Sequence, residues 1–221
     1  MLSYFSDRVA PGKIINIESG YRSPEYNNKI REKGANAAKT SAHMDGMALD
    51  FWLDGVDGKD LWETVRAKNC CGVGHYGGKT IHLDAGRPRF WEAVTSGTKS
   101  KEPDYNRHIY LSTDFDRYSA EEKVRLSLSG ISTFGFGVKP TAHVYGPADS
   151  EKPIAKMRIN TNATSKADCI MLDDRRASRA FHAALPPELS TGRYKIRVEF
   201  CKKPFEEMPS DVVSNEIELN K

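Results

Sequence analysis

The residues of this chain with the clearest potential for chemistry are histidines and aspartates in its first half. His43 and Asp50 lie seven residues apart, a spacing that suits a loop folding back into a strand. An aspartate inside the apolar stretch MALDFW is costly to bury without a partner, and a cation is an obvious one. His82 and Asp84 are two residues apart in IHLD, so on a strand both side chains point to the same face. The pattern therefore predicts a cation site.

A His, Asp, His set favours zinc in its catalytic arrangement, because three protein ligands leave the fourth position to water. Zinc brings the pKa of such a water toward about 7. Asp84 is then a candidate for the carboxylate that takes the proton. Arg22 is a candidate for polarising the carbonyl under attack and for stabilising the oxyanion. Taken singly, each histidine could instead be an ordinary structural residue.

Three segments in order resemble those of the M15 peptidases, the D-alanyl-D-alanine carboxypeptidase-like clan, and most of all the murein endopeptidase K branch. The segments are SGYRSPEYN (19–27), SAHMDGMALDFW (41–52) and GVGHYGGKTIHLDAGRPRFW (72–91). The resemblance covers residues 10–92, under half of the chain. It implies a zinc metallopeptidase that cuts bacterial peptidoglycan or its peptides, at D-amino-acid-containing cross-links or stem peptides. It also implies a periplasmic or extracellular location in the cell envelope.

Carried over by motif, the resemblance implies that His43, Asp50 and His82 bind zinc and that Arg22 contacts substrate. Asp84 is predicted to be the catalytic base or an orienting group. Related zinc peptidases carry His-x-His where this chain has His-Leu-Asp, so Asp84 as the third ligand, with His82 handling the proton, stays open. His75 and Tyr76, on the glycine-rich turn before this strand, are expected to line the cleft and bind substrate.

A second interpretation is a zinc-containing module that binds the cell wall or a protein without catalysis. Hedgehog-type signalling domains resemble the same peptidase fold. The feature that separates the two is a usable base. If Asp84 points away from the metal and no other carboxylate is near, the binding module is favoured.

The elements expected around these residues form a small α+β unit of the hedgehog and D-Ala-D-Ala-peptidase type, residues 1–94. Residues 13–20 and 47–53 are predicted strands. A helix is expected to begin at Ser23 as N-cap, with Pro24 in its first turn and Gly34 after its end. A second helix is expected over 58–68. Cys70 and Cys71 are expected to stay thiols, because adjacent cysteines rarely bridge.

The second half is predicted to be an all-β, immunoglobulin-like sandwich over residues 107–221, after a polar linker at 95–106. Short apolar runs alternate with clusters of Gly, Pro, Asn, Asp and Ser, the pattern of antiparallel strands and turns. In RYKIRVEF (193–200), every second residue is apolar. This part carries no catalytic constellation, so we expect an accessory role. A disulfide between Cys169 and Cys201 stays open.

The composition limits the remaining function classes. The 221 residues include 33 Lys plus Arg and 30 Asp plus Glu, a net charge of +3. This near-neutral balance does not favour a nucleic-acid partner. The chain has no run of 18 apolar residues, so no membrane span is expected. Its opening residues, MLSYFSDRVAPGK, show no signal peptide, so export would need an upstream segment or another release route. The bond cleaved, endo- or carboxypeptidase action and the oligomeric state stay open.

Overall fold

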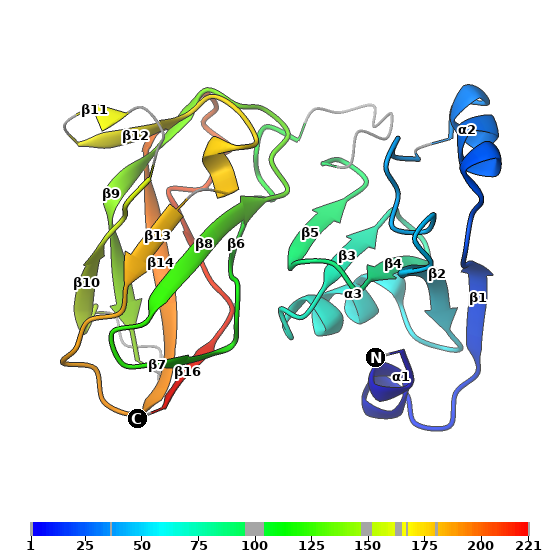
Figure 1. Ribbon diagram of the computed structural model, residues 1–221, viewed down its shortest axis with the longest axis horizontal. Helices are drawn as coiled ribbons and strands as arrows, with labels where there is room; N and C mark the ends of the chain where they lie inside the picture. The colour runs from blue at the N-terminus through cyan, green and yellow to red at the C-terminus, as the bar shows by residue number, and fades with distance from the viewer. Residues whose placement is uncertain are drawn as a thin grey trace. The chain divides into compact units, whose positions relative to one another are not determined.

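The computed structural model, shown in Figure 1, divides the chain into two compact units, Met1–Glu102 and Pro103–Lys221. The structure describes residues 2–35, 37–95, 104–146, 152–161, 165–166, 168–179 and 181–220. Most of the predicted linker, residues 96–103, lies outside these ranges. Within them, no helix is long and apolar enough to cross a membrane.

The first unit is a five-stranded sheet with three helices, which agrees with the α+β prediction. The helices are α1 (Leu2–Val9), α2 (Pro24–Glu32) and α3 (Gly58–Arg66); the strands are β1 (Ile15–Ser19), β2 (Ala48–Leu53), β3 (Gly72–His75), β4 (Ile81–Asp84) and β5 (Arg89–Glu92). The strand order is β1-β2-β4-β3-β5. All neighbouring pairs are antiparallel except β3 and β5, which run parallel.

The caps of the helices follow from the residues at their ends. The Ser23 side chain accepts a hydrogen bond from the Tyr26 N–H at 3.2 Å, and Pro24 opens α2, as predicted. Gly34 follows the end of this helix with a φ of +85°, a conformation that glycine adopts easily. Asp57 caps α3 in the same way as Ser23 caps α2. The helix α1 was not expected from the sequence.

The two faces of the first sheet differ in chemistry. On one face, α3 packs against β3 and β4. The fully buried apolar side chains on these elements and on β2 are Phe51, Leu53, Leu61, Trp62, Val65, Val73 and Ile81. Because side chains alternate along a strand, Asp50, His82 and Asp84 project from the opposite face. The apolar packing thereby fixes the strands from which these polar side chains project.

The second unit is built almost entirely of strands. Its larger sheet runs β11-β12-β9-β14-β16-β7, with β10 beside β9 and β15 beside β14, and its smaller sheet runs β13-β8-β6. The strands are β6 (Tyr110–Thr113), β7 (Arg117–Ser119), β8 (Lys123–Ser129), β9 (Phe136–Tyr145), β10 (Ala155–Arg158), β11 (Ser165–Lys166), β12 (Cys169–Leu172), β13 (Phe181–Ala184), β14 (Gly192–Lys202), β15 (Asp211–Val213) and β16 (Ile217–Asn220), with a 3₁₀ turn, η1, at Ala177–Arg179.

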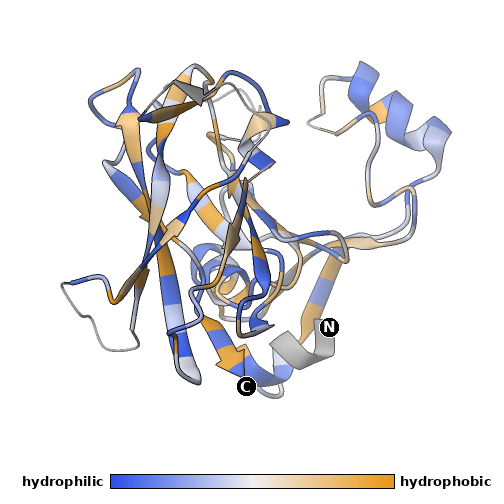
Figure 2. Ribbon diagram, turned by 60° about the vertical axis from the view of Figure 1, so that its left-hand side comes forward, coloured by the Kyte–Doolittle hydropathy of each residue, from blue (hydrophilic) through white to orange (hydrophobic). Residues whose placement is uncertain are grey.

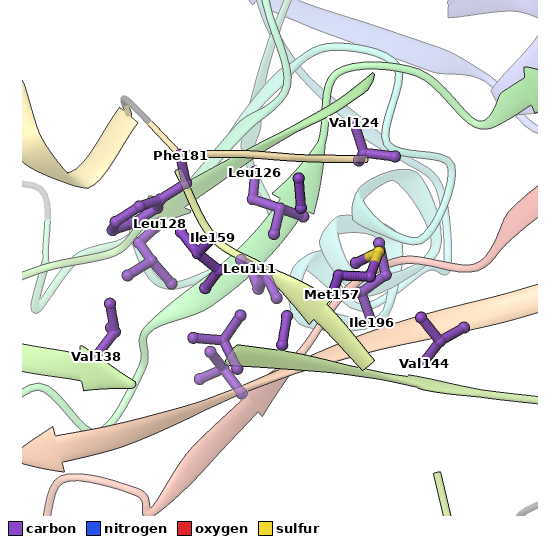
Figure 3. Packing of buried hydrophobic residues seen from close by; sticks show 14 of the residues in the cluster. Leu111, Val124, Leu126, Leu128, Val138, Val144, Met157, Ile159, Phe181 and Ile196 are labelled. Atoms are coloured by element: carbon purple, nitrogen blue, oxygen red, sulfur yellow. The ribbon is translucent and has the colours of Figure 1, made fainter. Parts of the chain in front are cut away.

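One buried apolar cluster joins the two sheets of the second unit. Leu111, Leu126 and Phe181 come from the smaller sheet, and Val144 and Ile196 come from the larger one (Figure 3). The alternation of apolar and polar residues along the strands can be followed in Figure 2. Each sheet therefore buries one face against the other, which is the two-layer arrangement of a β-sandwich.

Both cysteine pairs are joined. Cys169 on β12 and Cys201 on β14 form a disulfide with a Cα–Cα distance of 5.9 Å. Cys70 and Cys71, in the turn between α3 and β3, are also bonded to each other. The expectation that they stay thiols is therefore wrong. That expectation rested on the rarity of disulfides between adjacent cysteines. The turn that holds them has an unusual backbone, since Asn69 has a φ of +48°.

Candidate metal centre

The register between β2 and β4 positions two of the candidate ligands. Asp50 lies directly opposite His82, and Ala48 lies opposite Asp84. Cross-strand partners in an antiparallel pair have their Cβ atoms roughly 4.5–5.5 Å apart, so their side chains meet on the same face. The short side chain of Ala48 leaves space beside Asp84.

A tight turn before β2 positions His43. The Met47 N–H donates to the Ala42 carbonyl at 2.9 Å, and the Gly46 N–H donates to the His43 carbonyl at 3.3 Å. Gly46 has a φ of +67°, which suits glycine. The Arg22 N–H also donates to the His43 carbonyl, at 3.0 Å. The loop therefore folds back onto the sheet, as the spacing of His43 and Asp50 predicted.

Three side-chain atoms converge at this point of the sheet. His43 Nε2 lies 3.2 Å from Asp50 Oδ1 and 3.2 Å from His82 Nδ1. His82 Nδ1 lies 2.9 Å from Asp50 Oδ1. His43 and His82 are 2% and 7% exposed. Among the described residues, these three form the group of histidine and carboxylate ligands that could hold a metal ion.

The outer hydrogen bonds of the two histidines decide which nitrogen faces the centre. His43 Nδ1 lies 2.7 Å from the Gly20 carbonyl, which can only accept, so Nδ1 carries the proton. His82 Nε2 lies 2.9 Å from Asp84 Oδ2, an ionised acceptor, so Nε2 carries the proton. In the neutral imidazoles, His43 Nε2 and His82 Nδ1 then present lone pairs.

These donor atoms fit a zinc ion. Two nitrogen atoms and one carboxylate oxygen face a common point, a donor set that suits a cation. Zinc bound to nitrogen and oxygen at about 2.0–2.1 Å in a tetrahedron has ligand atoms about 3.3 Å apart, close to the distances found here. The chemistry and the spacing of the three atoms therefore agree with a zinc centre.

Asp84 lies behind this centre, on the far side of the His82 ring. Its Oδ2 meets His82 Nε2 and, at 2.5 Å, Arg89 Nη2. Its Oδ1 accepts from Gly86 N at 2.8 Å and from Arg89 Nη1 at 2.9 Å. Both carboxylate oxygens are therefore occupied, and the side chain is fully buried.

Arg22 contacts one of the converging residues directly. Its Nη2 donates to Asp50 Oδ2 at 2.5 Å, and its Nε donates to Ser19 Oγ at 2.8 Å. Asp50 thereby turns Oδ2 toward Arg22 and Oδ1 toward the two histidines. A charge-assisted bond of this kind orients the carboxylate as well as stabilising it.

Hydrogen bonds keep both carboxylates ionised despite their burial. Burial by itself raises the pKa of Asp50, but hydrogen bonds from the His43 and His82 rings when these carry a proton toward it, together with their positive charge, outweigh this and lower the pKa well below its usual range. The same balance, with His82 and Arg89 as partners, lowers the pKa of Asp84. For His82, burial lowers the pKa, but the hydrogen bonds to Asp50 and Asp84 raise it by more, so the net effect is a raised pKa.

A cavity of about 310 Å³ opens over the converging atoms. Its described lining comprises Arg22, Ala37, Ala38, Thr40, Ser41, Ala42, His43, Asp50, Tyr76, His82, Arg89 and Trp91. The Trp91 Nε1–H donates to Tyr76 Oη at 3.0 Å, and its ring centroid lies 5.2 Å from that of His82. Tyr76 and Trp91 thus form an aromatic wall of the cavity.

The structure brings together most of the residues that the sequence singled out, but not His75. His75 is absent from the cavity lining, and its Nε2 lies 3.1 Å from the Gly78 carbonyl. Strand alternation explains this, because His75 follows Gly74 and points to the other face of β3. Arg89 and Trp91, which were not among the predicted site residues, lie at the site. The signal for them was the pair of glycines in GVG, which leave room above β3.

Known proteins are similar to the part of the chain that contains the candidate centre. The family described as peptidoglycan L,D-endopeptidase MepK matches residues 3–91. The peptidoglycan L,D-endopeptidase MepK of Escherichia coli K12 is 34% identical over 80 residues, which is 36% of this chain and 44% of that protein. The probable MepK of Haemophilus influenzae is 35% identical over 81 residues, again 36% and 44% of the two chains.

Residues 3–91 thus resemble the M15 MepK-like family. The chain spans less than half the length of these curated relatives. A chain of a solved structure, described as the third ScaB cohesin of R. flavefaciens in complex with a group 1 dockerin, matches 51% of this chain over 95% of its own length. That match has 14% identity and a TM-score of 0.26. Within the M15 match lie all the residues of the candidate centre.

Proposed function

We propose that the N-terminal unit is a zinc-dependent peptidase that hydrolyses peptide bonds of bacterial peptidoglycan. One observation carries the proposal: His43 Nε2, Asp50 Oδ1 and His82 Nδ1 converge within 3.2 Å of one another at the base of a cavity. The resemblance of residues 3–91 to the M15 MepK-like family supports the same reaction class.

In this proposal His43, Asp50 and His82 hold the ion, and Asp84 orients His82. A zinc ion held there supplies a Lewis acid and a water nucleophile at neutral pH. Arg22 fixes Asp50 so that a single carboxylate oxygen faces the histidines, and its guanidinium lies in the lining, where it can hold a substrate carbonyl or carboxylate. Burial raises the pKa of Tyr76, so its hydroxyl stays protonated and can donate to substrate.

The proposed substrate follows from the relatives and from the cavity. The curated relatives are named peptidoglycan L,D-endopeptidases, so we propose an L,D bond of a cross-link or stem peptide. Such peptides carry carboxylates, and Arg22 and Arg89 place two guanidinium groups in the lining. The lining also includes the small side chains of Ala37, Ala38 and Ala42, which leave room for a peptide. The proposed location is the cell envelope.

One observation favours the second candidate, a non-catalytic zinc module that binds wall or protein. Asp84 points away from the three converging atoms, and both of its oxygens are engaged. Asp50 is the sole carboxylate in the described lining of the cavity. A base in addition to the ligand set is therefore missing from that lining, and hydrolysis has to be tested directly.

The test couples metal content with digestion of purified peptidoglycan, in the presence and absence of a chelator. We expect one zinc per chain and chelator-sensitive release of muropeptides, with mass spectrometry naming the bond. His43→Ala should lose both zinc and hydrolysis, because it removes a ligand. His75→Ala is the matched control, a histidine outside the cavity, and should keep both.

Two results would redirect the assignment. Zinc without hydrolysis in the unchanged chain would establish the binding module instead of the peptidase. Hydrolysis retained by His43→Ala would show that the ligand set is wrong. For the second unit we propose an accessory, immunoglobulin-like sandwich that binds the wall or a partner, and this rests on its fold class alone.

A further inference from the structure

We propose that Arg89 is a positioning residue for the metal centre, acting on His82 through Asp84. The inference rests on the metal site of the proposed function and adds a residue to it. Arg89 meets Asp84 with two parallel hydrogen bonds, and Asp84 meets the outer nitrogen of His82. The order of contacts from the surface to the centre is therefore Arg89, Asp84, His82.

The sheet register explains how Arg89 reaches Asp84. Gly72 on β3 pairs with Asp84 on one side and with Arg89 on the other, so the two charged residues lie two strands apart. Neighbouring strands are about 4.8 Å apart, so a side chain must span roughly 10 Å to cross the strand between. The long side chain of arginine can make this crossing.

Gly72 leaves the space for this contact. A Cβ at this position would lie 2.3 Å from Arg89 Nη1 and 2.4 Å from Asp84 Oδ2. The ion pair therefore lies directly over the glycine, with no room for a methyl group. The Gly86 N–H adds a further bond to Asp84 Oδ1. Arg89, Gly86 and His82 together therefore make four hydrogen bonds with the carboxylate.

This arrangement gives Arg89 a role in metal binding. The two bonds from Arg89 fix the plane of the carboxylate, and Oδ2 in that plane accepts from His82 Nε2. The proton is thereby kept on Nε2, and the lone pair of Nδ1 faces the centre. Without Arg89, the buried carboxylate would lose its counter-charge and be free to rotate or recruit water.

The experiment measures zinc affinity by competition with a chromophoric chelator, using the full chain. Arg89→Met should weaken zinc binding by up to about 10–100-fold, the effect of removing a direct outer partner of a metal ligand, because Arg89 acts on His82 through Asp84. Arg87→Met is the matched control, because Arg87 is an exposed arginine of the same β4–β5 turn. It should stay within about twofold of the unchanged chain, as expected for a surface charge.

A double variant tests whether the effect passes through Asp84. Asp84→Asn should weaken zinc binding by itself, and adding Arg89→Met should then cause little further loss. Equal affinity of the Arg89→Met and Arg87→Met variants would overturn the proposal. So would full additivity of the two losses, since Arg89 would then act by another route.

Arg89→Lys covers the case in which Arg89→Met does not fold. Lysine keeps the charge but cannot make two parallel bonds, so its affinity should lie between those of the unchanged chain and Asp84→Asn. Affinity equal to that of the unchanged chain would contradict the proposal. Zinc affinity is measured without peptidoglycan, so it tests metal binding separately from hydrolysis. If the variants rank in zinc affinity as predicted but the unchanged chain releases no muropeptides, the peptidase proposal alone is disproved. An unchanged chain that binds no zinc disproves the inference as well.

Discussion

Asp50 and Asp84 carry negative charges next to the same histidine but have different neighbours. Asp50 shares its two oxygens between Arg22 and the pair of histidines. Asp84 gives all its bonding capacity to Arg89, Gly86 and the outer side of His82. In the proposed site one carboxylate is thus suited to bind the metal and the other to orient a ligand.

A buried phenol in the second unit shows how a single residue links folding to pH. The Tyr118 hydroxyl donates to Asp114 Oδ1 at 2.6 Å and accepts from Phe115 N at 2.9 Å. Burial and the Asp114 carboxylate both raise the pKa of Tyr118. Ionising this hydroxyl in the folded chain is therefore harder than in the unfolded chain.

We expect Tyr118→Phe to lower the free energy of unfolding by about 1–2 kcal/mol at pH 8, through loss of the hydrogen bond. Because the folded pKa lies above the unfolded value of about 10, this contribution is full below pH 10. Above pH 10 the unfolded chain ionises first, so the difference between the two proteins shrinks by up to about 1.4 kcal/mol per pH unit. Urea unfolding at pH 8, 10 and 11 measures it, and a constant difference would contradict the pKa argument.

At the scale of the elements, β3 lies between two strands whose side chains meet above it. Gly74 pairs with His82 on β4 and with Trp91 on β5. A Cβ at Gly74 would lie 2.3–2.5 Å from three atoms of the Trp91 indole. The ring of Trp91 therefore crosses β3 to reach His82 and the Tyr76 hydroxyl.

Gly74→Ala should displace the Trp91 indole and destabilise the first unit by about 1–3 kcal/mol, as overpacking does. Tryptophan fluorescence during thermal unfolding measures this. Gly20→Ala is the matched control, because its Cβ would make an ordinary contact of 3.6 Å with Leu49. If both variants unfold at the same temperature, the crossing of Trp91 over Gly74 does not constrain the strand.

The sequence was sufficient to predict the local elements that position the candidate ligands. The caps of α2 and the two-residue spacing of His82 and Asp84 depend on residues close in the chain, and the structure has them as expected. The strands of two or three residues, β7, β11 and β15, were not singled out, because they are too short to show an alternation.

The contacts made across the sheet could not be predicted. Arg89 bonds Asp84 because β5 pairs with β3 in a register that places Arg89 beside Gly72, and strand partners depend on contacts between distant parts of the chain. The same limit applies to His75. Its neighbour Tyr76 reaches the cavity, whereas His75 points to the other face of the sheet. The sequence pattern placed both residues on one turn and could not separate them.

At the scale of the whole molecule, the two units carry different spectroscopic and covalent features. The chain has three tryptophans, and all of them, Trp52, Trp62 and Trp91, lie in the first unit. The disulfide between Cys169 and Cys201 lies in the second unit and closes a segment of 32 residues. Tryptophan fluorescence therefore reports on the first unit, and the disulfide constrains the second.

Replacing both Cys169 and Cys201 by serine should lower the free energy of unfolding of the second unit by about 2–4 kcal/mol. Far-ultraviolet circular dichroism would follow this transition. The transition seen by tryptophan fluorescence and the zinc affinity should stay unchanged, because the candidate centre lies in the other unit. A matching shift in the fluorescence transition would show instead that the two units unfold together.

Glycines of the strands recur where neighbouring side chains meet above them. Gly72 lies under the Asp84–Arg89 pair, Gly74 lies under Trp91, and a Cβ at Gly137 of β9 would lie 2.4 Å from Cys169 Sγ and 3.1 Å from Cys201 Sγ. Each glycine and the side chains above it are therefore expected to change together in evolution. During sequence divergence, a larger residue can replace such a glycine only after the group above it has been lost, so the order of these substitutions is constrained by geometry.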